Sequence, residues 1–162
     1  MAARLDLAAS KGCDGVDPDN VDAYRNNDGG GLGLTAADSV EYVNWLADEA
    51  HARGLAVGLK NAMEIIPEVV GRMQWAVNEQ CAEYHECEGK GKDKGVREGG
   101  GLSRFVEAGK PVFHIEYPKG EEVNDDRPVT EEQRRRACEV DGREGFSTLI
   151  KNMDLDEYWE VC

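Results

Sequence analysis

The chain has 162 residues, of which 40% are hydrophobic and 32% are charged, as expected for one globular domain with a sizeable core. Its formal net charge of −14 argues against a nucleic acid as the partner, because phosphates require a basic surface, and favours a cationic ligand. No apolar stretch approaches the roughly 20 residues of a membrane span, and the first residues show no signal peptide.

The first half of the chain alternates predicted strands with predicted helices. Thr35 and Asp38 form a capping box that opens one helix, and Gly54 is a suitable residue to end it. Pro67 limits the next helix to a short one or a late start. We predict strands at 12–17, 55–59 and 75–78, and helices at 35–54 and 62–73.

The second half continues the same alternation after a polar, glycine-rich segment, 89–101, that we predict to be a flexible loop. Thr130 and Gln133 form a second capping box. We predict strands at 111–116 and 146–150, and helices at 102–108, 130–140 and 154–162.

Consecutive βα units with near-continuous apolar strands predict an α/β protein with a parallel sheet flanked by helices. A doubly wound open sheet and a TIM-type (β/α)₈ barrel both fit this pattern. We favour the barrel, in which the polar strand ends converge on one face. Only about five βα units are visible, whereas a whole barrel has eight, so the sequence predicts an incomplete barrel.

Five cysteines are too few for a disulfide scaffold and too many for a typical cytosolic enzyme. Cys13 falls within a predicted strand and is expected to be a buried free thiol. A zinc site built from Cys81, His85 and Cys87 lacks a fourth ligand and the usual spacing, so we expect no metal and no other cofactor. An oxidised, secreted protein is the better interpretation.

Carboxylates follow two of the predicted strands. Asp14, Asp17, Asp19 and Asp22 lie around the end of the first strand, and Glu79 ends another. Glycoside hydrolases use two carboxyl groups that converge on the substrate. One group protonates the leaving oxygen while the other attacks or stabilises the anomeric carbon.

Five segments resemble glycoside hydrolase family 114, the endo-α-1,4-polygalactosaminidases, and they occur in the family's order over nearly the whole chain. They are RLDLAA (4–9), GCDGVDPDNVDAY (12–24), GLAVGLKN (54–61), NEQCAEYHEC (78–87) and FHIEY (113–117). The resemblance implies that residues 1–162 form the C-terminal part of a single (β/α)₈ barrel domain. The first three strands of the family's barrel are not seen here.

The resemblance also implies an activity and site residues. The activity is cleavage of α-1,4-linked galactosamine and N-acetylgalactosamine polymers, which are cationic and so suit an acidic protein. Asp19 matches the family's nucleophile and Glu79 its acid/base, and Lys60 would help to keep Asp19 charged. The motif positions expected to bind substrate are Asp17, Asp22, Tyr24, Lys60, Asn61, Asn78, Tyr84 and Glu116.

Several alternatives stay open from the residues alone. Asp17, Asp22 and Glu116 have structural roles as alternatives to substrate contact, and Lys60-Asn61 could simply end a strand. A catalytically impaired polysaccharide-binding fragment is the alternative function, and a truncated gene model would explain the missing front part. We expect the full-length protein to be extracellular, although this chain shows no signal peptide.

Overall fold

The structure is a computed structural model that describes residues 1–87, 101–121 and 123–162. The predicted loop 89–101 therefore lies outside the described residues except at its last position. The helices are α1 (Ala2–Ser10), α2 (Ala36–His51), α3 (Ile66–Val69), α4 (Ser103–Glu107) and α5 (Glu131–Cys138), with short helical turns at Ala23–Arg25, Gly29–Gly33 and Met63–Ile65. The strands are β1 (Gly15–Val16), β2 (Ala56–Lys60), β3 (Trp75–Glu79), β4 (Val112–Glu116), β5 (Ser147–Lys151) and β6 (Trp159–Val161).

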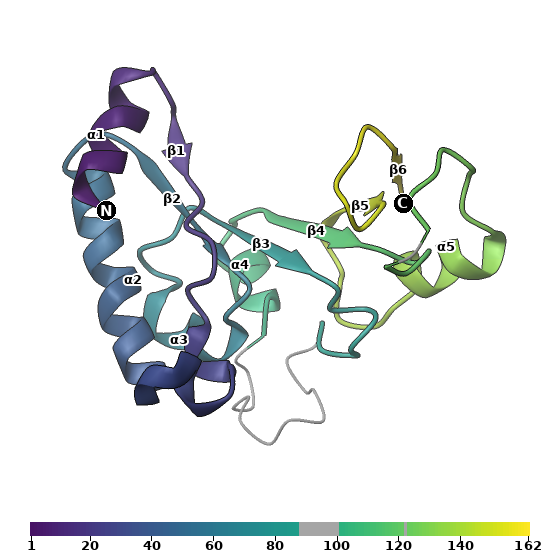
Figure 1. Cartoon of the computed structure of the whole chain (residues 1–162), viewed down its shortest axis with the longest axis horizontal. Helices are drawn as coiled ribbons and strands as arrows, with labels where there is room; N and C mark the ends of the chain where they lie inside the picture. The colour runs from purple at the N-terminus through teal and green to yellow at the C-terminus, as the bar shows by residue number, and fades with distance from the viewer. Residues whose placement is uncertain (88–100, 122) are drawn as a thin grey trace.

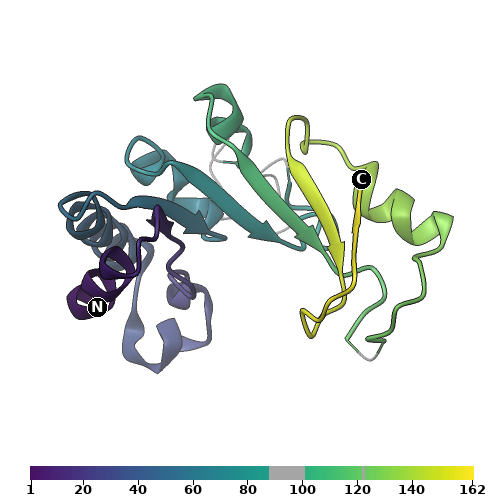
Figure 2. The same ribbon diagram turned by 90° about the horizontal axis from the view of Figure 1, so that it is seen from above.

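Among the described residues, the strands form one sheet in chain order, from β1 to β6. The pairs from β1 to β5 are parallel, whereas β6 pairs antiparallel with β5. Figures 1 and 2 show α1 and α2 at one end of the sheet and α5 at the other, with β3 and β4 between them. The predicted α/β class with five parallel strands is thus confirmed.

Helix α2 begins and ends at the predicted signals. Thr35 accepts a hydrogen bond from the backbone N–H of Asp38, and the Asp38 carboxylate accepts one from the backbone N–H of Thr35. This capping box satisfies two N–H groups that a helix end leaves without partners. Gly54 follows the helix with a φ of 72°, a conformation that glycine adopts without a steric penalty.

Side chains alternate between two faces of the sheet, and only one face is packed under helices. We call that side the covered face; it carries Val57, Leu59, Ala76, Asn78, Val112, His114, Glu116, Thr148 and Ile150, all buried. The other side is the open face, formed by Gly58, Lys60, Trp75, Val77, Glu79, Phe113, Ile115, Ser147 and Leu149. On the open face, Phe113 remains 46% exposed.

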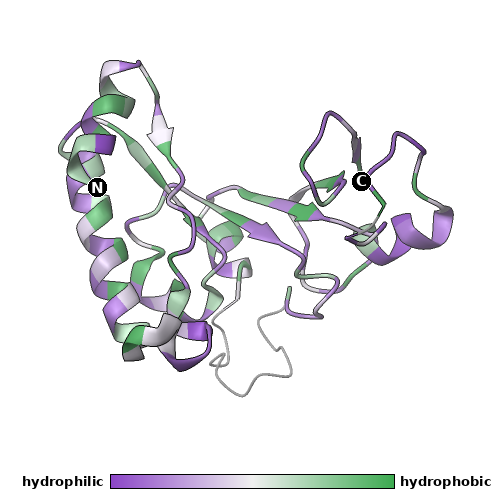
Figure 3. Cartoon of the chain, in the orientation of Figure 1, coloured by the Kyte–Doolittle hydropathy of each residue, from purple (hydrophilic) through white to green (hydrophobic). Residues whose placement is uncertain are grey.

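The main core joins the covered face to the helices. Ala47 and Ala50 of α2, Val69 of α3 and Phe105 of α4 are fully buried in one cluster with strand residues. A smaller second core lies at the C-terminal end and consists of Val129, Ala137, Ile150 and Tyr158. Figure 3 shows that α5 is mostly hydrophilic, so this end has little apolar surface to bury. A Cys138–Cys162 disulfide ties α5 to the chain end.

Three local predictions are wrong and one holds in part. The helix expected at 62–73 breaks into a 3₁₀ turn and α3, because Ala62 adopts a left-handed φ of 52°; the short helix with a late start that Pro67 predicts is confirmed. No helix forms at 154–162; residues Trp159–Val161 instead form β6, which uses the backbone groups of β5. The strand expected at 12–17 shortens to Gly15–Val16, and Cys13 before it is exposed rather than buried.

Within the described residues, no helix combines the length and the apolar content that crossing a bilayer requires.

Candidate active site

Lys60 and Glu79 end neighbouring parallel strands and lie on the open face. Lys60 pairs with Val77, two residues before Glu79, so both side chains leave the sheet on the same side. The Lys60 Nζ lies 2.6 Å from Glu79 Oε2 and 3.1 Å from Asp19 Oδ1. The structure therefore brings together Asp19, Lys60 and Glu79, which are predicted site residues from three strand ends.

Asp19 lies in the loop after β1, and its side chain is 64% exposed. The hydrogen bond from the Lys60 ammonium lowers the pKa of Asp19 from its usual value. Burial alone would lower the pKa of Lys60, but its hydrogen bonds to Glu79 and Asp19 raise it. Lys60 thus stays cationic and Asp19 stays a carboxylate, as the sequence predicts.

Asp17 is the third carboxyl group of this cluster. Its pKa is raised to about 6, chiefly by desolvation and further by the nearby charges of Asp19 and Glu79, while the Lys60 ammonium opposes the rise. Gly58 has no Cβ atom. If one were added, Asp17 Oδ1 would lie 2.8 Å from it and the Trp75 ring would lie closer still. Glycine at 58 is therefore what makes room for Trp75 and Asp17.

Glu79 is held from two more directions. Tyr117, immediately after β4, donates a hydrogen bond from its hydroxyl to Glu79 Oε1. The backbone N–H of Glu79 donates to Asn61 Oδ1 over 2.9 Å. Sequence reasoning missed Tyr117, although strand alternation contained the signal: Glu79 pairs with Ile115, and Tyr117 lies two residues further on the same face.

A cavity of about 370 Å³ adjoins Glu79. Among the predicted substrate-binding residues it is lined by Asp22, Asn61, Asn78 and Tyr84, together with Arg25, Met63, Gln80 and Glu86. Tyr24 is not among the lining residues, because its hydroxyl donates to Glu64 Oε2 over 2.7 Å. Burial and this carboxylate raise the pKa of Tyr24 above its usual value.

Glu116 lies on the covered face, so the structure does not place it with Glu79. It is only 3% exposed, and its Oε1 accepts hydrogen bonds from the backbone N–H of Ala82 and contacts His114 Nε2, both over 2.7 Å. Its register puts it on the opposite side of β4 from Glu79, where it lines a second cavity with Ala82 and His85, and its contact with substrate stays a prediction. Asn78 is also on this face, where its Oδ1 accepts from the backbone N–H of Cys81.

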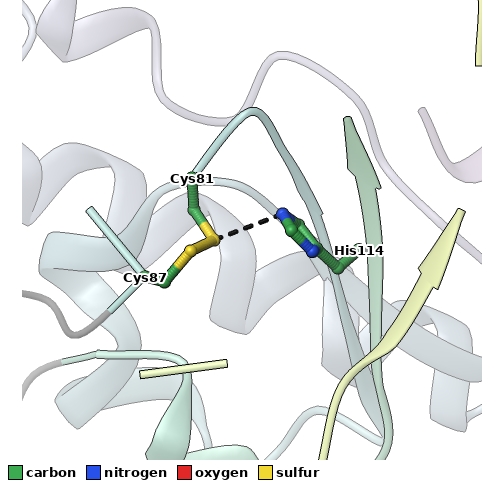
Figure 4. Close-up of side chains that lie close together, drawn as sticks. All are labelled: Cys81, Cys87 and His114. Carbon is green, nitrogen blue, oxygen red and sulfur yellow. Dashed lines mark hydrogen bonds between the residues drawn. A yellow bond between two sulfur atoms is a disulfide. The ribbon is translucent and has the colours of Figure 1, made fainter. Parts of the chain in front are cut away.

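The same buried region contains a disulfide. Cys81 and Cys87 are bonded to each other, and Cys81 Sγ lies 3.3 Å from His114 Nε2 (Figure 4). The three side chains converge closely enough to hold a metal ion, but the bond between the sulfurs removes both thiolate ligands. The histidine in contact with Cys81 is His114, which the rejected zinc grouping of Cys81, His85 and Cys87 did not include. The disulfide closes the loop that carries Tyr84 and Glu86 into the cavity beside Glu79.

Comparison with known proteins places this geometry in a family. The family model described as "Glycoside-hydrolase family GH114" matches residues 1–162. The chain belongs to glycoside hydrolase family GH114. The crystal structure of Aspergillus fumigatus Ega3 in complex with galactosamine is 53% identical, with a TM-score of 0.88. The match covers 100% of this chain and 59% of the Ega3 chain, so the chain spans well under two thirds of that relative.

Two further solved structures are similar in fold alone. They are the glycoside hydrolase domain of PelA from Pseudomonas aeruginosa and a variant of it, 16% and 17% identical, with TM-scores of 0.57 and 0.58. Each match covers 99% of this chain and 61% of the other. No curated protein matches the chain significantly. The GH114 chain thus has the fold of part of a TIM-type barrel, as the sequence predicts.

Proposed function

We propose that this GH114 chain carries the catalytic pair of an endo-α-1,4-polygalactosaminidase, with Asp19 as nucleophile and Glu79 as acid/base. The observation that carries the proposal is that both carboxylates bond the same ammonium group, that of Lys60. Their nearest oxygens lie 3.1 and 2.6 Å from Lys60 Nζ, so they can be no further apart than the sum of these distances.

This spacing favours retention of anomeric configuration. Retaining glycosidases hold their carboxyl groups about 5–5.5 Å apart, whereas inverting enzymes need roughly 6.5–9.5 Å to admit a water molecule. For the two nearest oxygens, the upper limit set by Lys60 falls below the inverting range, which supports the retaining spacing. In a retaining reaction, Glu79 protonates the leaving oxygen as Asp19 attacks the anomeric carbon, and Glu79 then takes a proton from the water that releases the sugar.

The charge of the site supports a substrate that carries amines. Three carboxylates, Glu79, Asp22 and Glu86, line the cavity with one cation, Arg25, and the chain as a whole has a net charge of −14. A cleft with an excess of one sign of charge concentrates ligands of the opposite sign. Ega3, at 53% identity, was crystallised with galactosamine. We therefore propose polymers of α-1,4-linked galactosamine, in part N-acetylated, as the substrate class, bound by Asp17, Asp22, Tyr24, Lys60, Asn61, Asn78 and Tyr84.

The test is turnover of an α-1,4-galactosamine oligomer by the full chain. Asp19→Asn and Glu79→Gln are each expected to lower kcat by at least about 1,000-fold, because each removes a group that acts on the reacting atoms. Asp14→Asn, which removes an exposed carboxylate from the same segment, is the matched control and should stay active. Full activity in either catalytic variant would overturn the role assignment. The anomer released first, followed by NMR, decides between retention and inversion.

A second candidate is a binding fragment that does not cleave. The exposed side chains of Phe113 and Leu149 favour it, because they belong to a face that a closed barrel would enclose. Binding of the oligomer without release of product, by a folded sample, would support this alternative.

We also propose that the full-length protein is extracellular. Two disulfides support this location, because such bonds persist mainly in oxidising compartments. Detection of the intact protein in culture medium would test it.

A further inference from the structure

The Glu79 carboxyl has a different partner on each oxygen. Oε2 receives the Lys60 ammonium over 2.6 Å, and Oε1 receives the Tyr117 hydroxyl. Because the Glu79 backbone N–H also donates to Asn61, both ends of the residue are anchored. Of the two groups that bond the Glu79 carboxyl, Tyr117 is the neutral donor, and it is nearly completely buried, at 7% exposed. A buried ring has few alternative rotamers, so its hydroxyl fixes where Oε1 lies.

We infer that Tyr117 is a positioning residue for Glu79: its hydroxyl sets the orientation of the carboxyl group. The inference rests on the proposed role of Glu79 as acid/base. A hydrogen bond donated to a carboxylate stabilises the carboxylate over the carboxylic acid. In a retaining glycosidase this matters in the second step, when the same carboxylate has to remove a proton from water.

The phenol remains a donor over the whole working range of pH. Burial raises the pKa of Tyr117 above its usual value, and the hydrogen bond to Glu79 raises it further. Tyr117 therefore does not compete with Glu79 for a charge; it only donates. Lys60 acts less specifically on Glu79, because its ammonium also bonds Asp19 and its charge therefore affects both carboxylates.

Other titratable groups face Glu79 from every side and must be kept constant in a test. Asp17 and Asp19 approach from the loop after β1, Lys60 from β2, and Glu116 contributes its charge at Tyr117 from β4. Asp22, Arg25, Tyr84 and Glu86 line the adjoining cavity. The informative substitution therefore changes Tyr117 alone and preserves its volume.

Tyr117→Phe is that substitution, and Tyr158→Phe is its matched control. Tyr158 is also buried, and it also donates its hydroxyl to a glutamate, Glu160, but in the second core. Carbon-13 NMR titration of the Glu79 carboxyl in the full chain gives a readout that does not need turnover. We expect the titration midpoint to rise by about one pH unit in Tyr117→Phe and to stay unchanged in Tyr158→Phe.

The same shift is expected in catalysis. The basic limb of the pH profile of kcat/KM, where the general acid loses its proton, should move to higher pH by the same amount in Tyr117→Phe. An unchanged midpoint in a folded Tyr117→Phe chain would overturn the inference. If Tyr117→Phe does not fold, site-specific 3-fluorotyrosine at 117 keeps the hydroxyl and makes it a stronger donor, so the midpoint should fall; no movement would also overturn the inference.

Failure of the proposed function gives a different result. If Glu79→Gln retains activity, the acid/base assignment is wrong, yet the carboxyl titration still reports whether Tyr117 controls Glu79. If Glu79→Gln is inactive and the Tyr117→Phe midpoint is unchanged, the assignment stands and the positioning role is rejected.

Discussion

The two faces of the sheet use the same kinds of residue for opposite purposes. On the covered face, Glu116 is buried and contacts His114 and the backbone N–H of Ala82. On the open face, Glu79 is partly exposed and beside a cavity, with Lys60 and Tyr117 as its partners. Both glutamates end strands, and only their register separates them. A strand-end carboxylate is thus a candidate catalyst only if its side chain leaves the sheet on the open side.

The contrast between the faces is largest for aromatic side chains. Phe105, fully buried beneath the covered face, is expected to cost about 3–5 kcal/mol of unfolding free energy when replaced by Ala. Phe113→Ala on the open face should cost less than about 1 kcal/mol, because its side chain is already 46% exposed. Urea unfolding of both variants measures the difference. Equal losses would show that the open face is covered in solution.

The carboxylate of the covered face tests whether Glu116 is structural. Glu116→Ala leaves the backbone N–H of Ala82 without its acceptor in a buried region, at an expected cost of about 2 kcal/mol. Glu116→Gln keeps an acceptor oxygen and should cost less. Thermal unfolding measures the stability of both variants, and a binding assay measures their affinity for the galactosamine oligomer. A Glu116→Gln chain that is fully stable but binds the oligomer poorly would show that Glu116 belongs to the binding site.

The last prediction concerns Asp17, and its effect on stability has the opposite sign. Its folded-state pKa of about 6 lies above the ordinary 3.8, so the folded chain binds more protons between these values and loses stability as pH rises through them. Asp17→Asn should therefore stabilise the chain above pH 6 and have no effect below pH 3.8. We expect only about 1 kcal/mol, because the side chain, although partly desolvated, keeps an exposed surface through which solvent screens its charge. Measuring the unfolding free energy of both chains above pH 6 and below pH 3.8 checks this prediction. Stabilisation by Asp17→Asn only at the lower pH would contradict it.

Much of this site could be predicted because polar residues at strand ends are visible in the sequence. Asp19, Lys60 and Glu79 each follow or end an apolar run, and parallel strands bring such ends to one edge. Tyr117 was missed because its importance depends on a register across two strands that are more than thirty residues apart. For the same reason the sequence did not show that Glu116 lies on the opposite face from Glu79.

Local sequence also failed where a tertiary contact decided the outcome. The segment 154–162 reads as a short helix, but the edge of β5 offers it backbone partners, and the disulfide to Cys138 together with the Arg134–Glu160 ion pair holds it there as β6. Helix propensity is a weak preference in so short a segment, and these contacts outweigh it.

The sequence by itself determined the alternation of strands and helices, the capped start of α2 and the carboxylates at the strand ends, because periodicity, capping and turn chemistry act over a few neighbouring residues. The tertiary structure alone decided which carboxylates meet. Strand register selects the face on which each side chain lies, and it placed Lys60 between Asp19 and Glu79 while it buried Glu116 behind them.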